Sequence, residues 1–336
     1  MKILGIDTSC DETAAAVVEN GRTVLSNVIA SQIKDHQEYG GVVPELASRK
    51  HIEAINYIVK RSLDEANLSF NDIDAIAVTN RPGLIGALLV GVAAAKSLAY
   101  SHNLPLLGIN HIEGHIYANY MVHETITFPH ICLTVSGGHT LLVEVYEGWK
   151  YKVLGTTQDD AAGEVYDKVA KYLGLGFPGG RIIDELSQEG NPTAIDFPRP
   201  MLHSGDYQFS FSGIKTAVRY FIEKDNKNGM NSKIEDIAAS FQAAVVDVLV
   251  AKTIQAAKAN SSRSITLTGG VAANSELRSS LTVVADEIDV KVYYPPIKLC
   301  TDNGAMIAGI AYEKYTQGLK DNLSLNAAAN GSLVDV

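Results

Sequence analysis

The sequence has few cysteines and no long hydrophobic run. Its three cysteines, in 336 residues, are an odd number, lie far apart and form no C-x-x-C pair, which argues against a zinc ribbon or a redox site and fits a reducing compartment. The longest apolar run, from Gly83 to Ala95, is shorter than the roughly 20 residues that span a bilayer, and we expect it to be a buried helix. Acidic residues interrupt the apolar N-terminal run, so no signal peptide is expected. These absences predict a cytoplasmic protein with no membrane partner.

Two common nucleotide-binding signatures are also missing. The chain has no G-x-x-x-x-G-K-[ST] loop and no G-x-G-x-x-G turn in a dinucleotide-binding context, which disfavours P-loop and Rossmann chemistry. The formal net charge of −10 argues against a protein that coats nucleic acid by bulk electrostatics, so a nucleic-acid partner must bind to a local basic face. Hydrophobic residues at 46% and charged residues at 20% are typical of a globular protein, and the length suffices for about two domains.

What the chain does contain is one strand–turn–hairpin module in two copies. In each copy an apolar strand runs into a polar turn, and a second strand, a short Gly-containing turn and a third strand follow. The first copy has strands at 3–6, 14–18 and 24–25, with an Asn20-Gly21 hairpin turn; the second has strands at 131–135, 141–145 and 151–154, with a Glu147-Gly148 turn. Two copies with polar or Gly-rich first turns suggest two related lobes that face one ligand.

The remaining segments alternate between strand and helix, which predicts an α/β fold with a mixed sheet in each lobe. Residues 31–62 have a helical pattern and are expected to form an insertion on the first lobe. The last helix, about 303–317, is expected to return to the first lobe, and the small polar tail after Leu323 is expected to fray. We therefore assign residues 1–128 and about 301–325 to the first lobe, and 129–300 to the second.

Two glycine turns follow apolar strands directly. Ser136-Gly137-Gly138-His139 and Gly269-Gly270 are placed where backbone N–H groups can approach an anionic ligand with no side chain in the way. An ordinary glycine turn is the commoner explanation of either sequence taken alone. Their repetition at strand ends favours a nucleotide-binding cleft.

A histidine pair predicts a metal site. His111 and His115 are four residues apart and so share one face of a helix, at the spacing that a single metal ion needs. Glu113 lies two residues from each and points to the far side, so it cannot be the general base of an H-E-x-x-H protease. Because a lone pair of histidines can also be a packing pair, a third ligand is required, and Asp302 is the best candidate. Two histidines and one carboxylate suit iron(II) or zinc with open positions.

Several carboxylates are candidates for the chemistry. Asp7, Asp11 and Glu12 crowd the first turn, where they could simply be solvent-exposed or could order a water, a metal or an amine. Asp167 and Asp184 could hydrogen-bond ribose hydroxyls. For Asp167 the alternative is a salt bridge to a lysine one helical turn on.

Eight ordered motifs resemble the universal tRNA threonylcarbamoyladenosine transferase family, TsaD in bacteria, over nearly the whole chain. They are Gly5-Ile6-Asp7-Thr8-Ser9-Cys10-Asp11-Glu12-Thr13, Pro82-Gly83-Leu84-Ile85-Gly86-Ala87-Leu88, Asn110-His111-Ile112-Glu113-Gly114-His115, Val135-Ser136-Gly137-Gly138-His139-Thr140, Asp159-Asp160-Ala161-Ala162-Gly163-Glu164, Phe209-Ser210-Phe211-Ser212-Gly213-Ile214-Lys215-Thr216, Gly269-Gly270-Val271-Ala272-Ala273-Asn274 and Cys300-Thr301-Asp302-Asn303. The chain departs from the family at Arg81, before Pro-Gly, and at Arg181, after Gly-Gly.

The resemblance implies two actin-like lobes, as in sugar kinases and Hsp70, with a nucleotide cleft between them. It implies transfer of threonylcarbamoyl from threonylcarbamoyl-AMP to the N6 amine of the adenosine beside the anticodon, in tRNAs that read codons beginning with A. By matching positions, His111, His115 and Asp302 would hold the metal, and Thr134, Val135, Ser136, Gly137 and Gly138 would contact the phosphate and acyl group. The nucleoside would bind to Asp167, Gly180, Asp184 and Asn274.

The implied partners are tRNA, an adenine nucleotide, a shorter paralogue of the same fold (TsaB-like) and a P-loop ATPase (TsaE-like). Because AMP is a good leaving group, no enzyme nucleophile is needed, and Asp11, Glu12 or His139 would accept the proton of the attacking amine. Three other hypotheses remain at this point: an ATP-dependent small-molecule kinase of the same fold, a metalloprotease and a non-catalytic nucleotide-binding scaffold.

Overall fold

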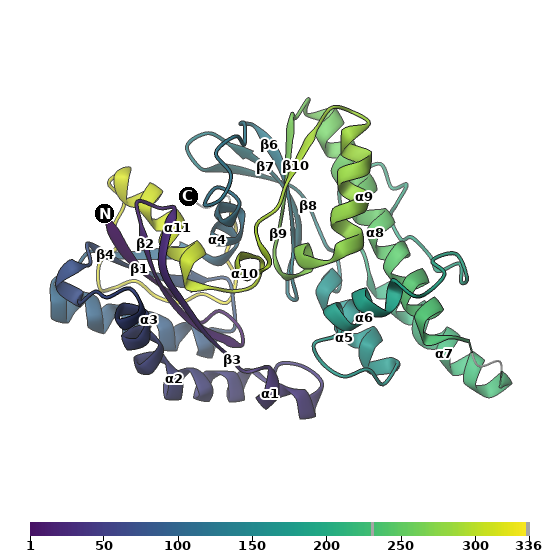
Figure 1. Ribbon diagram of the computed structural model, residues 1–336, viewed down its shortest axis with the longest axis horizontal. Helices are drawn as coiled ribbons and strands as arrows, with labels where there is room; N and C mark the ends of the chain where they lie inside the picture. The colour runs from purple at the N-terminus through teal and green to yellow at the C-terminus, as the bar shows by residue number, and fades with distance from the viewer. Residues whose placement is uncertain (230–231, 334–336) are drawn as a thin grey trace. The chain divides into compact units, whose positions relative to one another are not determined.

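The computed structural model describes residues 1–229 and 232–333, which form two compact units. Unit 1 consists of Met1–Glu124 and Pro295–Val336, and unit 2 of Thr125–Tyr294. Compared with the expected division, residues 125–128 lie in unit 2 and residues 295–300 in unit 1. Each unit contains one five-stranded mixed sheet (Figure 1).

The sheet of unit 1 has the strand order β3-β2-β1-β4-β5. Its strands are β1 (Lys2–Asp7), β2 (Glu12–Glu19), β3 (Thr23–Ser31), β4 (Ala75–Arg81) and β5 (Leu106–Asn110). The first three strands are antiparallel, and β4 and β5 run parallel to β1. Asn20 and Gly21 both have positive φ, 50° and 72°, as the Asn-Gly hairpin signal requires.

The helices of unit 1 include the expected insertion after β3. They are α1 (Ile33–His36), the 3₁₀ turn η1 (Gln37–Tyr39), α2 (Pro44–Glu65), η2 (Phe70–Asp72), α3 (Ile85–His102), α4 (His111–Ala118), α10 (Ile297–Cys300) and α11 (Gly304–Thr316). Helix α11 packs on β1 and β2, as the return of the last helix to the first lobe predicted (Figure 1). Gly5 permits this approach, because a Cβ there would lie 2.3 Å from the carbonyl oxygen of Gly304.

The sheet of unit 2 repeats the topology, with the order β8-β7-β6-β9-β10. Its strands are β6 (His130–Val135), β7 (Thr140–Tyr146), β8 (Lys150–Thr156), β9 (Ser264–Thr268) and β10 (Lys291–Tyr293). Strands β6 to β8 are antiparallel, and β9 runs parallel to β6. The helices of this unit are α5 (Ala162–Tyr172), α6 (Gly179–Ser187), α7 (Ser212–Asn228), α8 (Ile234–Ala259), η3 (Gly270–Ala273) and α9 (Ser275–Asp286).

Two helices, α3 and α8, are long and apolar enough to cross a membrane by length and composition alone. Helix α8 is a core helix, since 83% of its apolar window is buried inside the protein. In α3 only 33% of the window is buried, so the expectation of a buried helix holds for one face only. The reason is that α3 contacts the sheet and α2 along one face and leaves Ile85, Leu89 and Tyr100 exposed.

The C-terminal tail is ordered from Leu323 to Leu333, contrary to the fraying expected from its composition. It is held along unit 1 by backbone hydrogen bonds, from Gly83 N to the carbonyl oxygen of Ala329 and from Ala328 N to that of Asn80. Gly331 lies against the side chain of Arg81, where a Cβ would be 2.6 Å from Arg81 Cδ. Arg81, one of the two residues that depart from the family pattern, therefore packs against this tail.

Candidate functional site

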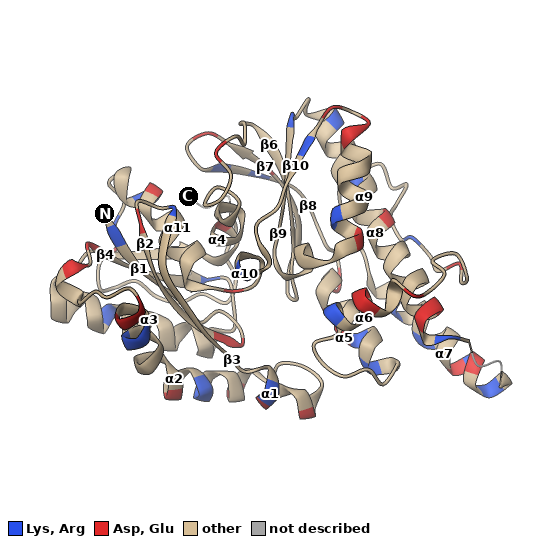
Figure 2. Ribbon diagram, in the orientation of Figure 1, with Lys and Arg blue, Asp and Glu red and all other residues tan. Residues whose placement is uncertain are grey.

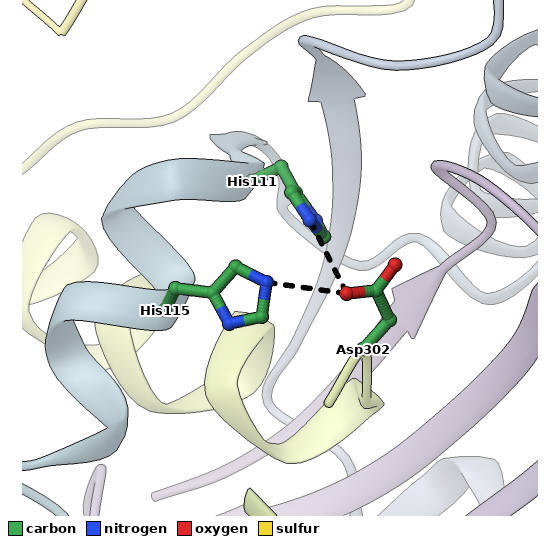
Figure 3. A group of neighbouring side chains, drawn as sticks. All are labelled: His111, His115 and Asp302. Atoms are coloured by element: carbon green, nitrogen blue, oxygen red, sulfur yellow. Dashed lines mark hydrogen bonds and ion pairs between the residues drawn. The ribbon is translucent and has the colours of Figure 1, made fainter. Parts of the chain in front are cut away.

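The two histidines and the distant aspartate meet in unit 1. His115 Nε2 lies 3.1 Å and His111 Nε2 lies 3.4 Å from the same oxygen, Asp302 Oδ1 (Figure 3). One ligand atom from each residue lies within 4.8 Å of the other two. This separation is compatible with a single cation bound by two imidazoles and one carboxylate.

Local capping positions the segments that carry these residues. Asn110 precedes α4 and accepts a hydrogen bond from Ile112 N at 2.8 Å, which fixes the helix start at His111. Asn303 follows Asp302 and accepts from Met306 N at 3.0 Å at the start of α11. Both asparagine caps are buried next to a candidate ligand. The helices approach closely at Gly114, where a Cβ would lie 2.9 Å from Ile307 Cδ1.

Asp7 orients His111. Its Oδ2 lies 3.1 Å from His111 Nδ1, so this nitrogen donates and Nε2 faces Asp302. Burial alone would lower the pKa of His111, but the charges of Asp302 and Asp7 outweigh burial and raise the pKa well above its ordinary value. A carboxylate behind a ligating imidazole is the usual outer-shell arrangement of a metal site.

Of the three candidate ligands, Asp302 and His115 titrate in the directions that such a site requires. Burial alone would raise the pKa of Asp302, but His111 and His115 outweigh it and hold the pKa well below the usual range of a carboxyl. Burial, followed by the neighbouring His111, lowers the pKa of His115. Asp302 is therefore a carboxylate and His115 a neutral imidazole, which are the protonation states that bind metal.

Glu113 faces away from this cluster, as its position in the helix predicted. It is buried and forms an ion pair with Lys314 of α11 at 2.6 Å. A carboxylate engaged in this way cannot activate a water beside His111 and His115. Glu113 therefore cannot be the general base of a metalloprotease.

The polar first turn of unit 1 is held tightly. Asp7 and Thr8 are fully buried, and Ser9 N donates to Asp7 Oδ1 at 2.8 Å. Helix α3 packs onto this turn: Thr8 Oγ1 donates to the carbonyl oxygen of Ala87, and a Cβ at Gly83 would lie 2.5 Å from the Ser9 carbonyl oxygen. The alternative that all the turn carboxylates are exposed was wrong, because Asp7 is in the core and Asp11 is 9% exposed.

Glu12 is the partly exposed carboxylate of this turn, and Asp11 precedes it. Burial, and next the charge of Asp11, raises the pKa of Glu12 well above the ordinary value for a carboxyl. Ser31 at the end of β3 donates to Glu12 Oε1 at 3.2 Å. An acid with a raised pKa is a stronger base when it is ionised, which suits proton transfer.

The corresponding turn of unit 2 is open. Thr134 and Val135 are buried in β6, whereas Gly137 and Gly138 are exposed. A Cβ at either glycine would meet no described atom beyond its chain neighbours within 4 Å. Ser136 Oγ accepts from His139 N at 3.1 Å, and Ser136 N donates to the His139 carbonyl oxygen at 2.8 Å, so the turn is compact although its tip is free of packing.

The other expected substrate-binding residues also lie in unit 2 and anchor helix starts. Asp167 Oδ1 accepts from Gly179 N at 2.7 Å, at the start of α6, and Gly180 follows. Asp184 accepts from Ser275 N and Ser275 Oγ, both at 2.9 Å, at the start of α9. Asn274 caps the same helix by accepting from Leu277 N.

Gln242 joins two of these residues, although no sequence motif marks it. Its Nε2 donates to Asp184 Oδ1 at 3.2 Å, and its Oε1 accepts from Asn274 Nδ2 at 2.7 Å. Gln242 is a buried amide in the long apolar helix α8. The only sequence signal for it is that a polar residue stands at a position where the helix pattern favours a hydrophobic one. Asp7 was named as a turn carboxylate, but its contact with His111 was likewise not foreseen.

Solved structures identify the fold. Component A of the (R)-2-hydroxyglutaryl-CoA dehydratase of Acidaminococcus fermentans is similar over 94% of this chain and 99% of its own, with a TM-score of 0.57 and 14% identity. HypF from T. kodakarensis matches 94% of this chain with 48% of its own, at a TM-score of 0.62 and 14% identity. These likenesses show the fold alone: it is the actin-like fold of the sugar kinase and Hsp70 class.

Sequence relatives define the family. The TsaD family, tRNA N6-adenosine threonylcarbamoyltransferase, matches residues 23–309. The enzymes of that name from Clostridioides difficile (strain 630) and Geobacillus kaustophilus (strain HTA426) are 53% and 55% identical over 327 and 333 residues, which is 97% and 99% of this chain and 97% of each relative. The chain therefore belongs to the TsaD family of acyltransferases that modify tRNA. Membership implies tRNA and nucleotide substrates, and together with the His-His-Asp cluster it is compatible with one bound metal ion.

Proposed function

We propose that this transferase takes its acyl group from threonylcarbamoyl-AMP. The observation that carries the proposal is the convergence of His111, His115 and Asp302 beside the turn that bears Asp11 and Glu12, all within unit 1. Unit 2 supplies the open Ser136–Gly138 turn. The kinase alternative gains no support from the compared relatives, which carry the name tRNA N6-adenosine threonylcarbamoyltransferase.

We propose that His111, His115 and Asp302 bind one Fe²⁺ or Zn²⁺ ion. The donor set of two imidazole nitrogens and one carboxylate oxygen suits both metals. The hydrogen bond from His111 Nδ1 to Asp7 leaves Nε2 as the ligand atom, which supports this assignment. When bound, such an ion supplies Lewis-acid stabilisation of negative charge on a substrate oxygen.

In unit 2, we propose that Thr134, Val135, Ser136, Gly137 and Gly138 contact the phosphate and acyl group. Because Thr134 and Val135 are buried in β6, their contribution would come from the backbone at the strand end, whereas Gly137 and Gly138 offer exposed backbone. Ser136 is buried and its N–H donates to the His139 carbonyl oxygen, so its contribution would be to shape the turn.

The nucleoside is assigned to Asp167, Gly180, Asp184 and Asn274. Gly180 and Asn274 lie at the starts of α6 and α9, and Asp167 and Asp184 accept hydrogen bonds from these helix starts. Both oxygens of Asp184 already accept hydrogen bonds, so a ribose hydroxyl would share an acceptor that the fold holds in place. The remaining capacity of a carboxylate, about four acceptor sites, allows this.

The chemical step is a direct displacement. The N6 amine of the tRNA adenosine attacks the carbamoyl carbon, a C–N bond forms, the bond from that carbon to the AMP phosphate oxygen breaks, and AMP leaves with the electron pair. The proton of the amine passes to Asp11, Glu12 or His139. We favour Glu12, because burial and the charge of Asp11 raise its pKa toward the range of an effective general base.

We propose that the TsaB-like paralogue binds unit 1 at α2 and α3 and that a TsaE-like P-loop ATPase acts with the pair, in the cytoplasm. These helices expose Ile52, Tyr57, Ile85, Leu89 and Tyr100. The cationic side chains of α2 offer little to RNA, since they are paired with acids, as the mixed colours of α2 in Figure 2 illustrate: Arg49 with Glu45, Lys50 with Asp35, Lys60 with Asp64 and Arg61 with Glu65. An apolar face with neutralised charge favours a protein over tRNA.

The proposal is tested by incubating the protein and its partners with threonylcarbamoyl-AMP and unmodified tRNA, followed by nucleoside mass spectrometry. We expect threonylcarbamoyladenosine and stoichiometric AMP. With [γ-³²P]ATP and no threonylcarbamoyl-AMP, a phosphorylated small molecule would instead establish the kinase alternative. The absence of the modified nucleoside under the first condition would contradict the proposal.

A further inference from the structure

Behind the carboxylate turn of unit 1 lies a buried chain of polar side chains that the proposed chemistry does not use. His51 of α2, Thr13 of β2, Gln32 at the end of β3 and His36 of α1 are 0% to 4% exposed. Each pair of neighbours in the chain lies within hydrogen-bond distance. Buried histidines are often only satisfied core residues, so the direction of each bond decides whether the cluster does more.

At one end of this hydrogen-bonded chain of side chains, the contact with Cys10 determines which ring nitrogen of His51 carries the hydrogen. Its Nε2 lies 3.0 Å from the backbone carbonyl oxygen of Cys10, which can only accept, so Nε2 carries the hydrogen. Nδ1 is then an acceptor and receives Thr13 Oγ1 at 2.8 Å and Gln32 Nε2 at 3.4 Å. Burial lowers the pKa of His51, in agreement with a neutral ring.

At the other end of these hydrogen-bonded side chains, the contacts of His36 independently determine the direction of each hydrogen bond, and they agree with the assignment at His51. Val43 N donates to His36 Nδ1 at 3.3 Å, so His36 Nε2 carries the hydrogen and donates to Gln32 Oε1 at 3.2 Å. Gln32 Oε1 is thereby the acceptor and Nε2 the donor, which matches its bonds to His51 Nδ1 and to the Ala47 carbonyl oxygen. One arrangement of protons, with both rings neutral, satisfies every bond from Val43 to Cys10.

The chain ends at the segment that carries the proposed proton acceptors. Cys10 immediately precedes Asp11, and Gln32 N donates to the carbonyl oxygen of Asp11 at 3.0 Å. Ser31, beside Gln32, donates to the Glu12 carboxylate. The backbone on both sides of Asp11 and the side chain of Glu12 are thus held from the end of β3 and from α2.

We propose that His51 is a positioning residue for the transfer: by donating from Nε2 to the Cys10 carbonyl oxygen, with its ring orientation fixed by Gln32 and Thr13, it sets the direction of the Asp11 and Glu12 carboxylates. The inference rests on the proposed role of these carboxylates. A displacement of about 1 Å in a reacting group can cost about 100-fold in rate, so this control is large enough to measure.

The test compares His51→Gln with His51→Asn. The glutamine amide can place its nitrogen where His51 Nε2 lies and so keep the bond to Cys10, whereas the shorter asparagine amide reaches only the position of Nδ1. We expect kcat of His51→Gln to stay within about 3-fold of the parent and kcat of His51→Asn to fall about 10- to 100-fold. KM for threonylcarbamoyl-AMP and the metal content should not change in either variant.

His130→Phe is the matched control, since His130 is a buried histidine at the far end of β6 from the Ser136 turn. We expect its kcat to equal that of the parent. Equal kcat values for His51→Gln and His51→Asn would overturn the proposal, as would a loss in His51→Asn that is explained by lost metal. If the parent itself fails to make the modified nucleoside, the proposed function fails; if only the two His51 variants behave alike, the positioning role alone fails.

Discussion

The two units build the same five-stranded topology and use the first turn of the module in opposite ways. In unit 1 the turn is filled: Asp7 and Thr8 are in the core, and Gly83 is required because a Cβ would strike the Ser9 carbonyl oxygen at 2.5 Å. In unit 2 the tip of the turn is open, and Gly137 and Gly138 are not required by packing. The comparison teaches that one copy of the module is specialised to hold side chains rigidly and the other to present bare backbone.

The largest expected effect comes from breaking the ligand set of the filled turn. His111→Ala removes one of three candidate ligands, so we expect loss of bound metal and a loss of transfer of about 1,000-fold or more, with the fold retained. Metal content is measured by elemental analysis and transfer by nucleoside mass spectrometry. Full turnover by the metal-free variant would contradict the role of the cluster.

Removal of the proposed proton acceptor should have the next largest effect. Glu12→Gln keeps the volume and cannot accept a proton, so we expect kcat to fall about 100- to 1,000-fold. Because the pKa of Glu12 is raised, the parent rate should increase with pH through a range above that of an ordinary glutamate, since only the ionised form accepts a proton. The pH profile of kcat checks this. If the pH profile of Glu12→Gln kept the ascending limb of the parent profile, another group would be the proton acceptor.

The two turns can be compared directly by alanine substitution of one glycine in each. Gly83→Ala should lower the free energy of unfolding by about 2 kcal/mol, because backbone at Ser9 must move. Gly138→Ala should change it by less than about 0.5 kcal/mol but weaken AMP binding about 10-fold, because the added methyl meets only a ligand. Urea unfolding and calorimetric titration with AMP measure the two quantities. Unchanged AMP affinity in Gly138→Ala would mean that the open turn is not a binding surface.

A further effect concerns the pH dependence of the stability of unit 2. Burial lowers the pKa of His130 to about 3, from 6.5. When a histidine stays neutral in the folded state, the protein loses stability as the pH falls below the pKa of that histidine in the unfolded chain, because only the unfolded chain binds the proton. The free energy of unfolding then falls by about 1.4 kcal/mol per pH unit until the pKa of the folded state is reached. His130→Phe should be less sensitive to acid between about pH 6 and pH 4. Parallel pH dependences of unfolding for parent and variant would exclude this origin.

Local signals predicted most of the fold, and long-range contacts account for what was missed. The Asn20-Gly21 turn and the alternation of apolar strands are encoded within a few residues, so both sheets could be foreseen. The order of the tail cannot be read from its composition, because it comes from partners such as Gly83 and Asn80, more than 240 positions away. Exposure along α3 was missed for a similar reason, since hydropathy does not say how much of a helix a neighbour covers.

The candidate site shows the same division. Helical spacing predicted that His111 and His115 share a face, and the structure places Asp302 beside them. The contact between Asp7 and His111 joins residues 104 positions apart, and Gln242 is an isolated amide in an apolar helix. Neither carries a local pattern, so only the fold reveals them.

The most direct test of the account is anomalous diffraction from crystals of the metal-loaded protein, recorded at the absorption edges of iron and zinc. The account predicts one strong peak per chain, within about 2.0–2.2 Å of His111 Nε2, His115 Nε2 and an oxygen of Asp302. A peak bound elsewhere, or none at this position in protein with stoichiometric metal, would contradict it.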